Sequence, residues 1–521
     1  MRRSRGQVWP LGSLDAHRTM FAALARNVAL TGIAYFIVSL VGLLLAPVLI
    51  AAYGVAGYGQ IILARIFLPS AAFGFLDLGV GENATRLVAT ARAKGSWPTA
   101  GQGIAVLCII SLATSIVAAC AIALAAGHIS GWLSIPSAQQ NGFASVLRIT
   151  AALLPFLFLS LIAEGIIKGF ENFGQLRSCE VASALTFGGA TLMLVDGGYG
   201  ANAICLAFLS SVTLRAAMAT FFAFGLCRAN SLRLAQYDRS VRQDIFAWSR
   251  TMLSNKILGV VQTQMASPLL GLLVGPAAVG LFDAIVRIPR FAKSIFALTS
   301  STVVPLAARL QAGDEAGAVS KLGLVGTLTA FVLFAPVTIM AMAFAEPIIH
   351  HWLGRAIEPY WYWLSLMLFV PLLSVSTSFG GSMLLANHAA VKRLNRLATI
   401  QIILQIGVSL ALLPFVSPWS FVIGQVASMF VIYPFQINLI RRELAIGSGL
   451  FRWLSIIFVS SLGVALLCRA SVPEPGLIDL VLILGGASTV WTAALIALMI
   501  KPDQRVRVFK RLWSLLRVRT A

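Results

Sequence analysis

Seven basic residues lie inside long apolar runs of this sequence: Arg65, Arg148, Arg215, Lys256, Arg287, Arg290 and Lys293. A charged side chain at the centre of a bilayer costs roughly 2.5–3.5 kcal/mol on insertion scales, so such residues normally face a bundle interior or an aqueous cavity. Arginine suits phosphate because its planar guanidinium can bind two oxygens at once. We therefore predict that these cations bind the phosphate or pyrophosphate part of a substrate.

Three of the cations share one predicted helix. Arg287, Arg290 and Lys293 recur every three residues around Pro289, which spreads them over roughly a third of the helix circumference. Three cations on one face repel each other unless something anionic lies opposite. We expect this face to line a central cavity. The alternative for any single cation is a snorkelling side chain or a structural ion pair.

Carboxylates in or near the same runs can neutralise some of this charge. A carboxylate and a cation four residues apart are neighbours on a helix. Three pairs have this spacing: Glu82 with Arg86, Glu164 with Lys168, and Asp283 with Arg287. The other cations need partners from other helices or from a ligand: Arg65, Arg148, Arg215, Arg290 and Lys293.

The composition is that of a membrane protein. Of the 521 residues, 59% are hydrophobic and 11% are charged, whereas soluble domains carry about 25% charged residues. The net charge of +21 is spread in short clusters between apolar runs, which favours membrane topology over nucleic-acid binding. The six cysteines show no CxxC spacing, and the adjacent His350 and His351 with Glu346 are weak evidence for a metal, so we expect no metal site.

The apolar runs predict an all-α, polytopic membrane protein with about fourteen transmembrane helices, because about twenty residues cross a core of about 30 Å. The first run, 28–52, is long enough to span the bilayer and is not expected to be a cleaved signal peptide. Only residues 414–419 separate the eleventh and twelfth runs, so thirteen spans remain an alternative.

The basic residues sort onto alternate loops, as the positive-inside rule requires. Most of the 39 fall on one side if the N-terminus is cytoplasmic, whereas the opposite loops hold only Arg355 and Arg469. An even number of spans places the C-terminus on the same side. There, cations interleave with leucines as in a basic amphipathic helix on anionic lipid, the alternative being a solvated tail: Arg505, Arg507, Lys510, Arg511, Arg517 and Arg519.

A short internal repeat suggests duplicated bundles. Gly54, Ala56 and Gly59 match Gly275, Ala277 and Gly280 at a constant offset of 221 residues, and six predicted spans separate the two turns. We expect two parallel six-helix bundles and two extra helices. The predicted segments are 1–27 (cytoplasmic), 28–227 (first bundle), 228–248 (cytoplasmic linker), 249–440 (second bundle), 441–500 (two further helices) and 501–521 (basic cytoplasmic tail).

No motif indicates catalysis or a cofactor. Residues 79–84 fit a permissive dinucleotide-binding GxGxxA pattern, but they end an apolar run without the βαβ unit that such a motif needs. The sequence contains no recognisable pairing of a nucleophile with a base. We therefore expect a protein that is not an enzyme and that needs no cofactor.

The span count, the repeated glycine-rich turn and the segment Phe75-Leu76-Asp77-Leu78-Gly79 followed by Asn83 and Arg86 resemble the polysaccharide transporter family of the multidrug/oligosaccharidyl-lipid/polysaccharide exporter superfamily. That resemblance implies two lobes around a V-shaped cavity, alternating access, and undecaprenyl-pyrophosphate-linked oligosaccharide as cargo in the bacterial inner membrane. It also implies export for surface polysaccharide such as lipopolysaccharide or exopolysaccharide, and a polymerase and glycosyltransferases as partners. Asp77, Glu82 and Asp283 are the candidates for coupling transport to an ion gradient.

Three other functions remain open. A drug or cation antiporter of the same superfamily would be expected to carry acidic and aromatic groups, and the cationic excess argues against it. A flippase for the peptidoglycan lipid precursor fits fourteen spans and a cationic cavity equally well. A glycan polymerase or ligase commonly has a large external loop, whereas the longest predicted outside loops, 127–142 and 346–360, are short.

Overall fold

The computed structural model describes residues 14–69, 71–234, 239–301, 316–384 and 388–499. Within these ranges the chain forms helices joined by short turns and contains no strand. This follows from the apolar sequence, because a helix satisfies its own backbone hydrogen bonds where lipid offers no partner. The predicted tail at 501–521 and residues 1–13 of the predicted N-terminal segment lie outside the described residues.

The first lobe is built from six membrane-crossing segments. Its elements are α1 (Leu14–Arg65), a 3₁₀ helix η1 (Ala72–Asp77), α2 (Val80–Lys94), α3 (Trp97–Trp132), α4 (Ser137–Gly169), α5 (Phe173–Asp196) and α6 (Ala201–Ala229). Gly54, with φ of 66°, bends α1 sharply. The residues before Gly54 form the first segment, and those after it begin the second, which continues through η1 and α2.

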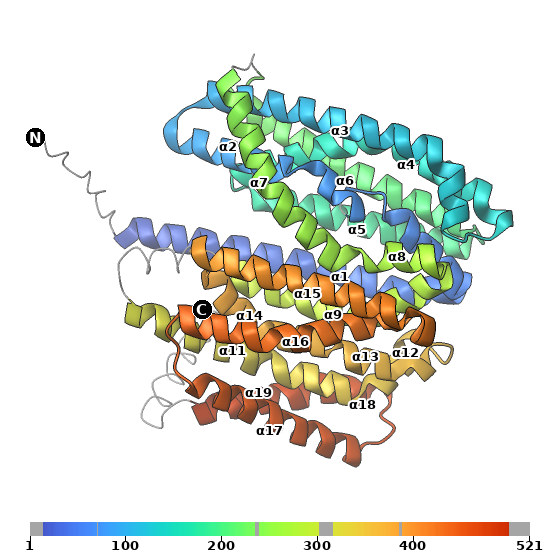
Figure 1. Cartoon of the computed structure of the whole chain (residues 1–521), viewed down its shortest axis with the longest axis vertical. Coiled ribbons are helices and arrows are strands. Elements are labelled where there is room, and N and C mark those ends of the chain that lie inside the picture. The colour runs from blue at the N-terminus through green and yellow to red at the C-terminus, as the bar shows by residue number, and fades with distance from the viewer. Residues whose placement is uncertain (1–13, 70, 235–238, 302–315, 385–387, 500–521) are drawn as a thin grey trace, which may run out of the picture.

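The second lobe follows, and α7 begins inside the stretch expected to be a linker. Its elements are α7 (Arg239–Gln264), α8 (Ala266–Leu273), α9 (Pro276–Ser301), α11 (Ala316–Ala343), α12 (Ala345–Leu353), η2 (Glu358–Tyr360), α13 (Trp361–Met367), α14 (Phe369–Leu384), α15 (His388–Val416) and α16 (Ser420–Glu443). Figure 1 places α2–α6 on one side of the molecule and α11–α16 on the other, with α1, α7 and α9 between them.

Two further membrane-crossing segments follow the second lobe. They are α17 (Gly449–Ser471) and a rod made of α18 (Leu477–Val481), a π-helical turn η3 (Leu482–Ala487) and α19 (Ser488–Met499). Both pack against α11 on the side away from the first lobe. They therefore extend the second lobe.

The helices agree with the expected number of about fourteen spans. Eleven described helices are long and apolar enough to cross a membrane. Three further segments cross the bundle but fail this composition test: the broken segment at 55–94, the rod of α7 and α8, and α9. These three carry most of the intramembrane charges. Charge and helix breaks thus concentrate in the segments nearest the lobe interface.

The repeated glycine turns form the crossing at which the lobes meet. Gly54 and Gly275 both adopt positive φ, 66° and 113°. A Cβ on Gly59 would lie 1.8 Å from the carbonyl oxygen of Pro276, and one on Gly280 would lie 2.1 Å from that of Val55. At the offset of 221 residues, Val55 corresponds to Pro276 and Gly59 to Gly280, so the two contacts are symmetry-related. A two-fold pseudo-symmetry axis therefore passes through the crossing.

Each lobe places its first helix against the other lobe. In α1, the Phe36 ring lies 6.2 Å from the Phe291 ring of α9, centroid to centroid. In the symmetry-related position, α7 packs against η1, α2 and α3 of the first lobe. The helix α1 also packs on α5, and α7 on α15. The two first helices are therefore shared between the lobes.

The second membrane-crossing segment is broken, which its continuous apolar sequence does not reveal. Helix α1 ends at Arg65, near Pro69, and the chain continues into η1. Leu78 and Gly79 then take left-handed conformations with φ of 51° and 75°. The backbone N–H of Gly79 donates to Asp77 Oδ1 at 2.7 Å. A polar side chain thus satisfies part of the exposed backbone, as a break inside a membrane requires.

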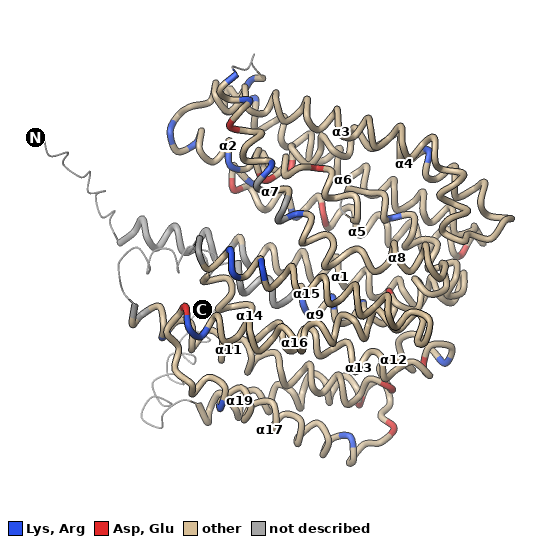
Figure 2. The backbone as a smooth tube through the Cα atoms, in the orientation of Figure 1, with Lys and Arg blue, Asp and Glu red and all other residues tan. Residues whose placement is uncertain are grey.

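Lys and Arg gather at one end of the bundle. Figure 2 shows this at the end where α2 leads into α3, which we call the basic end. The opposite end carries the turns at Gly54 and Gly275, and we call it the turn end. The distribution agrees with the charge sorting along the sequence.

Candidate functional site

Three arginines surround one carboxylate at the lobe interface. Asp283 on α9 accepts hydrogen bonds from Arg287 at 2.9 Å and from Arg290 at 2.7 Å. Asp283 also accepts a 2.6 Å bond from the Tyr58 hydroxyl of the first lobe. Arg65 lines the same cavity from the first lobe. We call Arg65, Arg287 and Arg290 the arginine cluster.

Arg65 is the member of the cluster that has no carboxylate partner. Its guanidinium carbon lies 4.0 Å from the centroid of the Phe208 ring on α6, and it forms no ion pair within the described part of the chain. A cation–π contact holds the guanidinium in place but leaves its N–H groups free to donate. Arg65 ends a helix at the break in the second segment, which turns it toward the interface.

Arg287 connects the cluster to α1. It pairs with Asp283 and also donates to the backbone carbonyl of Gly42. Its guanidinium lies 5.4 Å from the Tyr58 ring. Since α1 contacts α9 through this bond and through Phe36, any ligand that competes for Arg287 also acts on the contact between the two helices.

The cluster lines two adjoining cavities. The smaller, about 250 Å³, contains Arg65, Asp283, Arg287 and Arg290 in its wall. The larger, about 300 Å³, reaches into the first lobe and shares Arg65 and Arg287 with the smaller one. Three guanidinium groups face one carboxylate in the smaller cavity, so its ionisable wall carries net positive charge. Such a wall suits an anion that can accept several hydrogen bonds.

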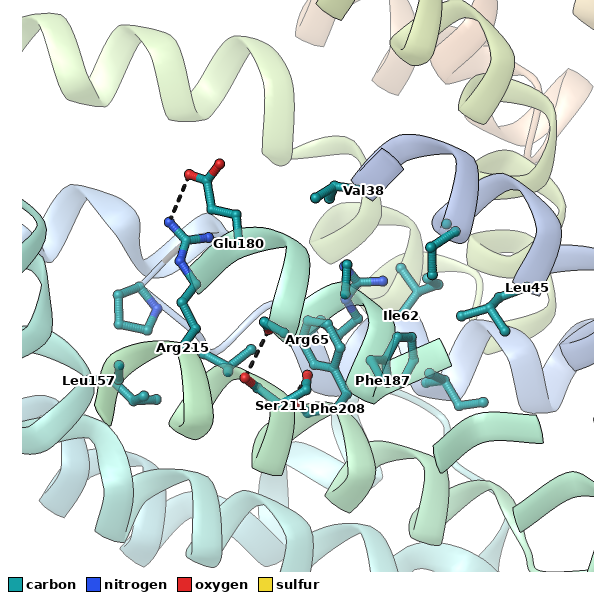
Figure 3. A pocket seen from close by; sticks show the side chains of 18 of the residues that line it. Val38, Leu45, Ile62, Arg65, Leu157, Glu180, Phe187, Phe208, Ser211 and Arg215 are labelled. Atoms are coloured by element: carbon teal, nitrogen blue, oxygen red, sulfur yellow. Dashed lines mark hydrogen bonds and ion pairs between the residues drawn. The ribbon is translucent and has the colours of Figure 1, made fainter. Parts of the chain in front are cut away.

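The two carboxylates in the far wall of the larger cavity are neutralised by arginines, one of them behind the wall. Arg215 on α6 donates to Glu164 on α4 at 2.8 and 3.0 Å, and it reaches Glu180 on α5 at 3.4 Å. Glu180 also pairs with Arg177 at 2.6 Å. Figure 3 shows Arg215 directed toward Glu180, and Arg65 beside Phe208. Two cations and two carboxylates neutralise each other here, so this network ties three helices together.

Lys256 joins the lobes nearer the basic end. It pairs with Asp77 in η1 and lies 3.1 Å from Glu82 in α2. A second pair, Arg86 with Asp244 at 2.8 Å, links the same two parts of the structure. Asp77 is buried and Asp244 is largely exposed, with 8% and 63% of the side chain accessible. The Lys256 pair is therefore the one that solvent screens less.

The predicted site residues do not all converge. Arg65, Arg287 and Arg290 meet in one cavity, and Arg215 lines the adjoining one. Lys256 pairs with carboxylates at the α2–α7 contact, and Lys293 lines a separate cavity in the second lobe. Arg148 is exposed on α4 and lines none of the cavities described here.

Two of the three expected ion pairs are wrong. Asp283 does pair with Arg287, one turn away. Glu164 instead pairs with Arg215 rather than Lys168, and Glu82 pairs with Lys256 rather than Arg86. Helical spacing finds partners only within one helix, and here the carboxylates face neighbouring helices. Asp77, Glu82 and Asp283 each hold a cation, and their role in ion coupling stays a prediction.

Two residues of the site were not foreseen from the sequence. Tyr58 lies in the glycine-rich turn, where the repeat pattern indicated only close packing, yet its hydroxyl donates to Asp283 across the interface. Phe208 is one of many phenylalanines in apolar runs and lies against Arg65. Neither position carries a signal in a single sequence, because both roles depend on contacts between distant segments.

These features define a class: a multi-pass helical membrane protein whose two pseudo-symmetric lobes enclose a charged central site. Residues 97–361, half of the chain, match a family model described as "Polysaccharide biosynthesis protein". The chain belongs to this polysaccharide biosynthesis family, which confirms the resemblance seen in the sequence. A comparison with curated proteins gives no match.

Three solved structures that share the fold carry titles naming a flippase or a transporter. A structure titled "Lipid II flippase MurJ, inward closed conformation" matches with a TM-score of 0.67 at 15% identity, over 91% of this chain and 99% of that one. A multidrug resistance MATE family transporter of the MOP superfamily, in an inward-facing conformation, matches with a TM-score of 0.61 at 14% identity, over 81% and 96%. A MOP superfamily transporter from Pyrococcus furiosus gives 0.57 at 15%, over 81% and 95%. At these identities the likeness establishes the fold alone.

Proposed function

We propose that this protein is a flippase that moves undecaprenyl-pyrophosphate-linked oligosaccharide across the bacterial inner membrane during synthesis of a surface polysaccharide. One observation carries the proposal. Arg65 from the first lobe and Arg287 and Arg290 from the second lobe share one cavity with a single carboxylate. Pyrophosphate is the part of such a cargo that three guanidinium groups recognise best, because each can donate two hydrogen bonds to its oxygens.

The position of the arginines gives binding a mechanical consequence. An anion held by Arg65 and Arg287 contacts both lobes at once, so its binding free energy differs between states in which the lobes are differently arranged. It also competes with Asp283 and with the Gly42 carbonyl for Arg287. Occupation of the site thus weakens the link between α9 and α1. The protein acts as a transporter and not as an enzyme.

The charge distribution sets the orientation in this proposal. The basic end faces the cytoplasm, as the positive-inside rule demands, and the turn end faces outward. The crossing at Gly59 and Gly280 then closes the outer side of the site. Cargo loads from the cytoplasmic leaflet and leaves outward after the lobes rock apart at this crossing. The polymerase that extends the glycan would receive it there.

A drug antiporter fits the site less well. A cationic drug would meet three arginines and one carboxylate in the smaller cavity, which is the wrong sign of charge. A peptidoglycan precursor also carries pyrophosphate, so the arginine cluster fits it equally well. The family match to polysaccharide biosynthesis favours the oligosaccharide, and the experiment below separates the two.

The test uses cells from which the gene has been deleted. We expect lipid-linked oligosaccharide to accumulate on the cytoplasmic leaflet, surface polysaccharide to disappear, and peptidoglycan synthesis to continue. The variants Arg65→Gln and Arg290→Gln should restore export at least about tenfold less well than wild type, because a hydrogen bond to a charged group contributes about 1.5–3 kcal/mol.

Arg148→Gln is the matched control, because it removes an arginine from a membrane helix outside the cavities. It should restore export fully. Normal surface polysaccharide in the deletion strain would refute the proposal, and loss of peptidoglycan synthesis instead would assign the other lipid cargo.

A further inference from the structure

A third cavity, of about 420 Å³, lies in the second lobe and has a different chemistry from the arginine cluster. Amides and hydroxyls from four helices line it, and among the described residues of its wall Lys293 is the one charged side chain, with no carboxylate. We define the glutamine groove by six of these residues: Gln262, Ser378, Gln401, Gln405, Gln425 and Gln436. The function proposed so far uses none of them.

The glutamines lie on helix faces that point the same way. Gln401 and Gln405 are one turn apart on α15, and Gln425 and Gln436 are three turns apart on α16, so each pair shares a face. On α14, Ser374, Ser378 and Ser382 repeat every four residues toward the same space. Three separate helices thus present polar stripes to one cavity within a membrane protein.

The amides of the groove are poorly satisfied by the protein. Gln405 Oε1 is buried without a hydrogen-bond partner among the described residues. The amide nitrogen of Gln262 reaches Gln401 Oε1 only at 3.4 Å, a long hydrogen bond. The amide nitrogen of Gln401 donates to the Met429 sulfur at 3.5 Å, and a thioether sulfur is a weak acceptor. A buried amide without a good partner costs about 1–3 kcal/mol. Gln401 and Gln405, 8% and 7% exposed, are two such amides in one cavity wall, and they point to a ligand that supplies both donors and acceptors.

We propose that the glutamine groove is a subsite for the uncharged sugar residues of the cargo, which rests on the proposed flippase function. Sugar hydroxyls and acetamido groups both donate and accept hydrogen bonds, as glutamine amides do. Lys293, three residues after Arg290 on α9, lies about 4.5 Å further along the helix axis. The pyrophosphate binds at the arginine cluster, and the glycan attached to it extends past Lys293 into the groove.

The size of the site supports this division. Ligand pockets commonly measure about 300–1,000 Å³, and the cavity lined by all three members of the arginine cluster is only about 250 Å³. That space suits a pyrophosphate, and the adjoining cavity of about 300 Å³ ends at the ion-paired Glu164, Glu180 and Arg215. Neither cavity offers sugars the amides that line the groove. The groove supplies the additional room and the chemistry that the arginine cluster lacks.

The experiment compares two lipids on purified protein in nanodiscs. The probes are undecaprenyl pyrophosphate and the lipid-linked oligosaccharide extracted from the deletion strain. Wild type should bind the glycosylated lipid at least about tenfold more tightly, because each satisfied amide contributes about fivefold. Gln401→Leu, Gln405→Leu and Gln425→Leu should each reduce this preference and leave the affinity for undecaprenyl pyrophosphate unchanged. Gln175→Leu, a partly buried glutamine of the first lobe, is the control.

A second variant tests the groove without removing a polar group. Gly381 lines the groove, and a Cβ built on it meets nothing within 4 Å. Gly381→Leu should therefore fold normally, fill part of the space and abolish the preference for the glycosylated lipid. Gly407→Leu on α15, also at an open position, should leave it intact.

An unchanged preference in Gly381→Leu and in the glutamine variants overturns the subsite while leaving the flippase proposal standing. Wild type that binds neither lipid, or Arg65→Gln that binds undecaprenyl pyrophosphate as tightly as wild type does, overturns the pyrophosphate site on which both proposals rest.

Discussion

At the scale of single residues, Asp283 decides how strongly the site attracts an anion. It is 6% exposed and neutralises part of the charge of Arg287 and Arg290. In the proposed mechanism a bound pyrophosphate takes over that role, so Asp283 and the cargo would compete for the same guanidinium groups. We expect this competition to stabilise the empty site and to keep the anion from binding too tightly for release.

Asp283→Asn should separate these two effects. The ligand-free protein should lose about 3 kcal/mol of stability, because removal of one partner from a buried ion pair leaves the other charges unbalanced. Addition of inorganic pyrophosphate should then raise the thermal midpoint more than it does in wild type. Thermal unfolding with and without pyrophosphate measures both. Asp196→Asn, at an exposed carboxylate, is the control, and an equal response to pyrophosphate in Asp283→Asn and wild type would contradict the competition.

Arg215 has the contacts of a structural residue, although its sequence context predicts substrate binding. Arg215→Met should destabilise the protein by about 3–5 kcal/mol, because Glu164, 10% exposed, would lose its cation. The double variant with Glu164→Leu should recover most of that stability, since an apolar pair can replace an ion pair. Thermal unfolding and export of the double variant decide the matter. A stable double variant that exports nothing would show that Arg215 binds substrate in addition to its structural contacts.

At the scale of elements, the contact between α7 and the first lobe depends on burial more than on the number of ion pairs. Lys256 pairs with a carboxylate that is 8% exposed, whereas Asp244 in the neighbouring pair is 63% exposed. Exposed pairs contribute about 0–1 kcal/mol, and loss of one partner from a buried pair costs several times more.

Lys256→Gln should therefore reduce both the thermal midpoint and the amount of exported polysaccharide, and both reductions should be far larger than those caused by Asp244→Asn. Asp244→Asn should remain within about 1 kcal/mol of wild type. Both variants can be compared by thermal unfolding in detergent and by surface polysaccharide in the deletion strain. Equal effects of the two substitutions would mean that burial of Asp77 does not control this contact.

Hydropathy and charge sorting predict the helices and their number well, because both depend on composition over some twenty residues. They miss the break between Arg65 and Val80, since the apolar run is continuous there and Pro69 and Gly79 are the only hints. The sequence predicts only those contacts of the site that lie within one helix. Arg287 and Asp283 share one helix and were found, whereas the contacts of Tyr58 and Arg215 join segments far apart in the sequence.

At the scale of the whole molecule, the crossing of Gly59 and Gly280 holds the lobes together at the turn end. Gly59→Ala and Gly280→Ala each place a methyl group against backbone of the other lobe. Overpacking of this kind costs about 1–3 kcal/mol, which shifts a two-state equilibrium roughly 5- to 150-fold. Because the contacts are symmetric, both variants should open this end to a similar extent.

The measurement is labelling by an impermeant thiol reagent. A cysteine replaces Ile62, which lines both central cavities, in a chain whose six natural cysteines have been replaced. Labelling from the outside should rise several-fold in both glycine variants. Gly127→Ala, on α3 with open space around it, should change nothing. Strong labelling in one glycine variant and none in the other would show that the two contacts are not equivalent.

The paired glycine contacts also explain how the two halves can differ so much. In an isologous interface of a homodimer, residue i of one chain contacts residue j of the other, and residue j of the first contacts residue i of the second. The paired glycine contacts follow this pattern within one chain. In a dimer of identical chains every substitution appears twice, so an arginine at the axis would face its own copy. Fusion of the halves into one chain removes that constraint. The first lobe can therefore carry Arg65, Glu180 and Arg215, where the offset of 221 residues gives the second lobe Val286, Gln401 and Gln436.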